Sequence, residues 1–225
     1  MKAFINKWPV VLLCVLLGCV SVAWADAPED PAAAEPAQTT AAPAKDYASC
    51  FAAWDSNMHT LQTQFTQTTE YDGMRILRSN GQIFYEQKGP KLRLDTFENG
   101  QVNQSALTDK KQIYILDEKG KEISKVSWQE WLEGQPNQAL FDFGNYAALL
   151  KRHDVSVWQK QNGRVVLRLT PTDKDANYIL YITIAEKNCF PQTITIQVDL
   201  MKNTANLTDI KLNTELNPNI FKGLK

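Results

Sequence analysis

The chain has 225 residues, of which 44% are hydrophobic, and its 24 basic and 25 acidic residues nearly cancel. This balance, without a cluster of Lys or Arg, excludes a strong general binder of polyanions such as nucleic acid. The length and hydrophobic content suffice for one well-filled core.

Residues 1–25 have the pattern of a secretory signal peptide. Lys2 and Lys7 supply positive charge, the run 10–22 is apolar, and residues 23–25 (Ala-Trp-Ala) match the small-x-small pattern of a cleavage site. The apolar run is short for a transmembrane helix. We therefore expect export, cleavage near Ala25 and a location in the periplasm.

A second interpretation of the same segment stays open. Residues 16–19 (Leu-Leu-Gly-Cys) resemble a bacterial lipobox, in which Cys19 is acylated and becomes the mature N-terminus. The product would be a membrane-anchored lipoprotein rather than a freely diffusing protein.

Residues 26–45 predict a disordered linker. The stretch is rich in Ala and Pro and has no large apolar side chain, so it cannot bury enough surface to offset the entropy lost on ordering. The remaining residues, 46–225, are expected to form one domain.

Two cysteines, Cys50 and Cys189, lie outside the signal peptide. In an oxidising compartment such an isolated pair predicts a disulfide, which would join the first helix to a late strand. Two unconnected buried thiols are the alternative. No C-x-x-C spacing points to a redox-active pair.

The hydrophobic pattern predicts one helix followed by a series of strands. Residues 47–60 have apolar side chains at helical spacing, and after them the apolar period changes to that of strands. Asn162-Gly163 is the strongest hairpin signal. The expected strands are 61–71, 76–87, 91–97, 101–107, 112–116, 121–126, 155–161, 164–170, 178–185, 192–199 and 207–216.

These strands predict an antiparallel meander, because no helices of regular length separate them. The middle of the chain differs: residues 127–133 and 138–153 are strongly apolar and indicate helices. We expect them to lie across one face of the sheet, in a mainly β (α+β) fold. Their inward-facing side chains would be Trp128, Trp131, Leu140, Phe141 and Leu149.

Signatures of enzymes are absent from the sequence. It has no G-x-S-x-G, Walker-type loop, H-E-x-x-H or G-x-G-x-x-G. His59 and His153 are expected at helix ends, where the helix dipole favours a cation, and neither has a partner at metal-ligand spacing. We expect no catalytic residue, no metal and no cofactor.

Several segments resemble the periplasmic lipoprotein carriers of the LolA type. Each is weak alone, but their order and spacing are similar to the family over residues 46–221. The segments are 61–67 (LQTQFTQ), 81–85 (GQIFY), 89–93 (GPKLR), 108–115 (TDKKQIYI), 207–213 (LTDIKLN) and 217–221 (NPNIF).

This resemblance implies an incomplete antiparallel β-barrel whose concave side is covered by helices. The enclosed cavity would hold the acyl chains of lipoproteins, received by a monomer from an inner-membrane ABC-type release complex and passed to an outer-membrane acceptor. Besides the five inward-facing residues of the middle segment, the expected cavity lining is Phe65, Ile83, Tyr85, Leu92 and Leu94.

The resemblance also implies a lid or switch motif at Lys88, Pro90 and Arg93. Well-studied members of the family carry an Arg immediately before this proline, where this chain has Gly89. Two alternative functions stay open: a lipidated outer-membrane acceptor of the same fold, and a lipid-binding or envelope-stress-sensing module without a role in transport.

Overall fold

An antiparallel sheet of 11 strands forms the body of the protein, as described by a computed structural model for residues 44–134 and 143–224. Alternating apolar and polar side chains produce these strands, as in Ile179–Ala185, where buried and half-buried positions alternate. The strands are β1 (Thr60–Tyr71), β2 (Met74–Glu86), β3 (Lys91–Glu98), β4 (Gln101–Thr108), β5 (Gln112–Leu116), β6 (Glu122–Ser127), β7 (His153–Gln161), β8 (Arg164–Pro171), β9 (Ile179–Ala185), β10 (Pro191–Val198) and β11 (Met201–Leu212).

The order of the strands is β6-β5-β4-β3-β2-β1-β11-β10-β9-β8-β7. Two meanders, β1–β6 and β7–β11, are thus joined side by side through the antiparallel pair β1–β11. Because β6 and β7 are edges that do not pair with each other, the sheet stays open. This confirms the predicted fold class, an incomplete antiparallel barrel with a few helices.

Tight turns connect several of the strands. Asp72-Gly73, Asn99-Gly100 and Asn162-Gly163 each place both residues at positive φ, between 49° and 78°. Such two-residue loops match the twist of antiparallel strands. The hairpin predicted at Asn162-Gly163 is confirmed by the pairing of β7 with β8.

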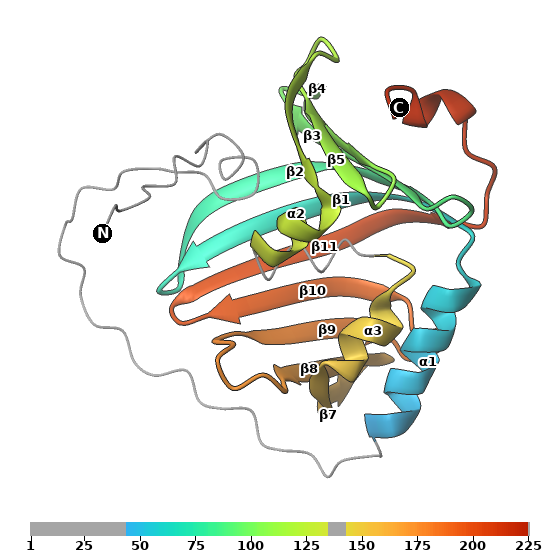
Figure 1. Cartoon of the computed structure of the whole chain (residues 1–225). Helices are drawn as coiled ribbons and strands as arrows, with labels where there is room; N and C mark the ends of the chain where they lie inside the picture. The colour runs from blue at the N-terminus through green and yellow to red at the C-terminus, as the bar shows by residue number, and fades with distance from the viewer. Residues whose placement is uncertain (1–43, 135–142, 225) are drawn as a thin grey trace, which may run out of the picture. The chain divides into compact units, whose positions relative to one another are not determined.

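Three of the four described helices lie over one face of the curved sheet, which we call the inner face (Figure 1). The second helix contacts β5 and β6, the first contacts β7 and β8, and the third contacts β7. The predicted disulfide is present and joins Cys50 in the first helix to Cys189, with 5.8 Å between their Cα atoms. The helices are α1 (Ala44–Asn57), α2 (Trp128–Gly134), α3 (Tyr146–Lys151) and the short 3-10 helix η3 (Pro218–Phe221).

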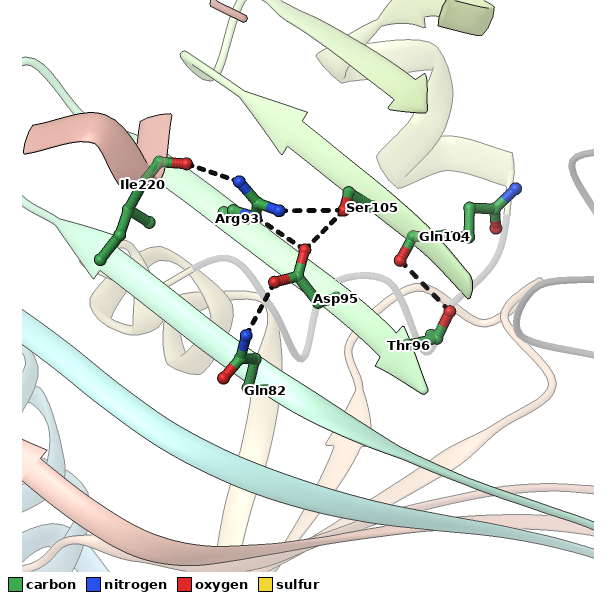
Figure 2. A network of polar contacts seen from close by, with 7 residues as sticks. All are labelled: Gln82, Arg93, Asp95, Thr96, Gln104, Ser105 and Ile220. Atoms are coloured by element: carbon green, nitrogen blue, oxygen red, sulfur yellow. Dashed lines mark hydrogen bonds and ion pairs between the residues drawn. The ribbon is translucent and has the colours of Figure 1, made fainter. Parts of the chain in front are cut away.

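The opposite, outer face of β3–β5 is covered by the C-terminal segment. The Arg93 guanidinium donates to the carbonyl of Ile220 in η3 at 2.9 Å and to the carboxylate of Asp95 at 2.7 Å (Figure 2). Ser105 and Gln82 also donate to Asp95, at 2.6 and 2.9 Å. The buried carboxylate of Asp95 thus has a cation and two neutral donors, as a buried charge requires.

Three predicted boundaries are wrong. The first helix spans Ala44–Asn57 rather than 47–60, because Thr60 already pairs with Glu86 as part of β1. The middle helix ends at Lys151 and His153 begins β7, because the backbone of His153 and Val155 pairs with Pro171 and Leu169 of β8. The last strand spans Met201–Leu212 rather than 207–216, because pairing with both β1 and β10 holds the polar residues 201–206 extended. The predicted signal peptide, nearly all of the linker, and Leu140 and Phe141 lie outside the described residues.

Candidate functional site

Apolar side chains of β2 and β3 share the inner face. Ile83 lies opposite Leu94, and Tyr85 lies opposite Leu92. Directly opposite residues of an antiparallel pair point to the same side, so these four side chains form one patch. All four are buried, with exposed fractions of 0–6%. Five residues of the expected lining therefore lie on this face, since Phe65 of β1 pairs with Gly81 of β2.

A close approach fixes the position of the Phe65 ring. A Cβ atom at Gly81 would lie 2.6 Å from the Phe65 ring and 1.9 Å from the carbonyl oxygen of Asp95. Only glycine leaves room for both neighbours, and the ring covers the backbone of β2 in place of a side chain. Phe65 is 1% exposed as a result.

The apolar inner face continues over the other half of the sheet. Ile196 of β10 pairs with Leu180 of β9, which pairs with Leu169 of β8. A parallel row runs through Ile194, Ile182 and Leu167. None of these six side chains is more than 4% exposed. The patch on β2 and β3 is thus one part of a larger buried apolar surface.

Helix α3 is fixed over this surface by α1. The carboxylate of Asp55 in α1 accepts hydrogen bonds from the backbone N–H of Gly144 at 2.7 Å and of Tyr146 at 2.8 Å, satisfying N–H groups at the start of α3. The rings of Phe51 and Tyr146 lie 4.9 Å apart. Leu149, predicted to face inward, is buried at 3% exposure.

Lys110 joins α2 to the same surface. Its ammonium group donates to the backbone carbonyl of Phe143 and lies 5.5 Å from the ring centre of Tyr85 and 6.0 Å from that of Trp128. Both rings attract the cation through their faces. Trp128 in turn stacks on Trp131, with 4.8 Å between ring centres, and both are 7% exposed. The two tryptophans are therefore buried in α2 where it packs on β5 and β6.

His153 is buried beside this region, and its surroundings favour the neutral ring. Its Nδ1–H donates to the Leu149 carbonyl at 2.7 Å, which leaves Nε2 to accept from the Tyr178 hydroxyl at 3.1 Å. Burial lowers the pKa of His153, and the charge of Arg152 lowers it further, against the effect of the Leu149 hydrogen bond. Burial, rather than a position at a helix end, therefore has the largest effect on this pKa.

Lys88 and Pro90 lie in the exposed turn between β2 and β3, and Arg93 points to the outer face. Arg93 is separated from the apolar patch by the thickness of the sheet, whereas its neighbours Leu92 and Leu94 belong to the patch. The lid or switch role expected for these three residues stays a prediction.

Within residues 44–134 and 143–224, no group of three or more His, Cys, Asp and Glu residues is placed to hold a metal ion. No helix in this part of the chain is long and apolar enough to cross a membrane. The feature that distinguishes the inner face is its large and mostly apolar buried surface, which suits contact with hydrocarbon.

The sequence matches the family model of the outer membrane lipoprotein carrier protein LolA over residues 56–223. The chain belongs to this family. Members of the LolA family are carriers or binding proteins for lipids and lipoproteins, consistent with a location in the cell envelope. The matched range includes every strand of the sheet.

Solved structures with low identity resemble the LolA-type fold of this chain. One is a DUF1329 family protein from Desulfovibrio piger, with 7% identity, a TM-score of 0.49, and coverage of 80% of this chain and 98% of that chain. A LolA superfamily protein, NE2245 from Nitrosomonas europaea, has 13% identity, a TM-score of 0.47, and coverage of 81% and 98%. The lipoprotein LppX from Mycobacterium tuberculosis has 10% identity, a TM-score of 0.48, and coverage of 77% and 97%. A search among curated proteins found no match.

Sequence reasoning missed the half of the inner face that belongs to β8–β10. The alternation of Ile and Leu with polar residues in 179–185 and 192–198 was a usable signal for one buried face. Which face it was depended on pairing with β11, and so on contacts distant in sequence. Asp55 and Lys110 had no local signal, because their partners lie 89 and 33 residues further along the chain.

Proposed function

We propose that this LolA-family protein is a periplasmic carrier that binds the acyl chains of lipoproteins and moves them from the inner towards the outer membrane. The observation that carries the proposal is the apolar inner face, which extends over β1–β3 and β8–β10 and is partly covered by helices. Each methylene removed from water contributes about 0.8 kcal/mol, so acyl chains that cross an aqueous space must be shielded by apolar surface.

The open sheet supports reversible binding. Because β6 and β7 are not paired with each other, the two halves of the sheet can separate or approach without breaking a strand pair. A carrier needs this freedom, since cargo must leave as well as enter. An inner-membrane ABC-type complex as donor and an outer-membrane acceptor as recipient complete the proposal, with the protein acting as a monomer.

The acyl-chain lining comprises the predicted residues of β1–β3 together with the helix residues Trp128, Trp131 and Leu149. Their burial on one face supports this assignment. Catalysis forms no part of the proposal, because the site offers apolar contact rather than a nucleophile and a base.

The experiment is native mass spectrometry of the protein purified from the envelope fraction without detergent. We expect a population with bound lipid or acylated peptide, whose mass identifies the cargo. Protein that never carries an acyl compound, even after incubation with an acylated lipoprotein, would contradict the proposal.

The mature N-terminus separates the carrier from the lipidated acceptor. We propose cleavage near Ala25 and a diffusible protein, whereas acylation at Cys19 would retain residues 19–25 and add the mass of the lipid. The intact mass of the protein from the exporting cell distinguishes the two forms.

A further inference from the structure

Buried polar side chains interrupt the apolar inner face, and two of them lie opposite each other on the central strands of the sheet. Thr69 of β1 and Asn203 of β11 lie directly opposite each other. Their row continues through Ile196, Leu180 and Leu169, all of which are apolar. Thr69 is 1% exposed and Asn203 is 5% exposed, so both are as buried as the apolar members of the row.

Neither group has a hydrogen-bond partner for its buried polar atom. The Thr69 hydroxyl oxygen and the Asn203 amide nitrogen are both buried without a partner. A buried polar atom in that state costs folding free energy, and nearly all such atoms in native proteins are paired. Two adjacent exceptions on the surface proposed to bind lipid indicate a partner that is supplied by the ligand.

Both unpaired groups can donate a hydrogen bond. Thr69 offers an O–H and Asn203 an N–H, so together they fit a neutral acceptor better than a second donor. A carboxylate or phosphate would need a compensating positive charge beside it. The residues that pair with Thr69 and Asn203 on their other sides are Leu77 and Ile196, which supply no charge. An ester carbonyl is a neutral acceptor and needs no such charge.

The position of the pair suits the ester linkage of a lipid. Thr69 lies two residues before the end of β1, and Asn203 lies two residues after the start of β11. Tyr71, Met74 and Leu200 at the adjacent hairpin ends are exposed apolar side chains, with 46–59% of their surface in solvent. In an acyl-glycerol lipid the ester groups lie between the hydrocarbon chains and the head group. Thr69 and Asn203 likewise lie between the apolar rows of the inner face and the exposed hairpin ends.

We propose that Thr69 and Asn203 form a polar site that binds ester carbonyls of a glycerol-linked acyl lipid, with the chains lying along the apolar rows. This inference rests on the proposed function and specifies the chemistry of its ligand. Diacylglyceryl-modified lipoproteins and diacyl phospholipids share this chemistry.

The test compares ester-linked and ether-linked lipids, because the ether analogue has the same chains but lacks the carbonyls. The probes are a fluorescent lipopeptide with S-(2,3-diacyloxypropyl)cysteine, its 2,3-dialkoxy counterpart, and the diacyl and dialkyl forms of phosphatidylethanolamine. We expect the protein to bind the ester form about fivefold more tightly than the ether form, as one or two net hydrogen bonds imply. The lipopeptide and phospholipid arms show which source is preferred.

Thr69→Val and Asn203→Leu remove the two donors with little change of shape. Each should reduce the preference for the ester while leaving ether binding unchanged. Their melting temperatures should stay the same or rise, because an unpaired buried polar atom has been removed. Thr68→Val is the matched control: Thr68 is the preceding residue of β1, faces the outer side, and should leave the preference intact.

Equal affinity of the unchanged protein for ester and ether lipids would overturn the inference and leave the proposed function standing. The inference is likewise overturned if the ester preference survives in Thr69→Val and Asn203→Leu, since the selectivity would then arise elsewhere. Failure to bind either form would contradict the proposed function itself. If a variant does not fold, the inference is still tested by comparing the affinities of the unchanged protein for the ester and ether lipids.

Discussion

Two neighbouring residues of β3 serve opposite faces of the sheet. Leu94 belongs to the inner apolar patch, whereas Arg93 crosses to the outer face and bonds the C-terminal 3-10 helix. The alternation of strand side chains separates the two roles over a distance of one residue. A substitution at either position should therefore affect one face far more than the other.

Leu94→Glu should abolish binding of acyl chains while the protein remains folded. The carboxylate would face the surface proposed to hold hydrocarbon, where its desolvation is unfavourable once lipid excludes water. Without lipid the cost should be smaller than for a charge in a closed core. Transfer of a fluorescent acylated peptide measures function, and thermal melting measures folding.

Leu107→Ala is the control for Leu94→Glu. Leu107 is fully buried on the outer face, near the C-terminal segment at Gly223. We expect a loss of about 2–5 kcal/mol in stability with acyl binding retained. A Leu94→Glu protein that binds lipid normally would show that the inner face is not the lipid site, and one that cannot fold would place Leu94 in closed core.

His153 should make stability depend on pH. Its pKa in the folded protein is lowered by burial, while in the unfolded chain it is about 6.5. The unfolded chain therefore takes up the proton first as pH falls, so the stabilisation is complete above about pH 6.5 and is lost below it. His153→Gln should show a weaker fall in melting temperature between about pH 7.5 and 5.5.

The second histidine provides an internal control for the pH experiment. His59 is exposed and is present in both proteins, so its contribution cancels in the comparison. An identical pH dependence for the unchanged protein and His153→Gln would mean that the folded ring takes up its proton as readily as the unfolded one.

At the scale of elements, α1 is the part most dependent on a covalent link. The disulfide Cys50–Cys189 closes a separation of 139 residues, and Tyr47 adds a hydrogen bond of 3.2 Å to Glu186. Replacing both cysteines with Ser should lower stability by about 4–5 kcal/mol, because the unfolded chain regains the entropy of an open loop. Hydrogen exchange should increase most in α1 and, through Asp55, in α3.

Denaturant unfolding with and without reductant measures the effect, and thiol counting under non-reducing conditions checks the bond itself. Two free thiols in the exported protein, or equal stability of the reduced and oxidised forms, would be incompatible with this role of the disulfide.

Elements with a clear local pattern could be predicted from sequence, and those set by distant pairing could not. The alternation in residues 91–97 predicted β3, which spans Lys91–Glu98, to within one residue. Asn162-Gly163 predicted the β7–β8 hairpin. The polar start of β11 has no such pattern and is held between β1 and β10. For the same reason Thr69 and Asn203 could not be recognised as neighbours before the register was known.

At the scale of the whole molecule, two meanders meet at β1 and β11 and leave the sheet open. The edge strands β6 and β7 carry charged side chains, among them Lys125 and Lys160, which discourage pairing with a second chain. The apolar residues instead lie on the inner face, beneath helices that are fixed by Asp55, Lys110 and the disulfide. The molecule combines a large hydrophobic surface with edges that discourage aggregation, as the proposed carrier function requires.

The central claim is that this surface carries acyl chains through water, and a transfer assay tests it most directly. Donor vesicles contain a fluorescent diacylated lipopeptide, and acceptor vesicles lack it. A porous filter that retains vesicles but lets the protein pass separates the two populations. We predict that the protein accelerates transfer in proportion to its concentration and that Leu94→Glu does not, while an unacylated peptide is ignored by both. Transfer at the spontaneous rate in the presence of folded, unmodified protein would contradict the account.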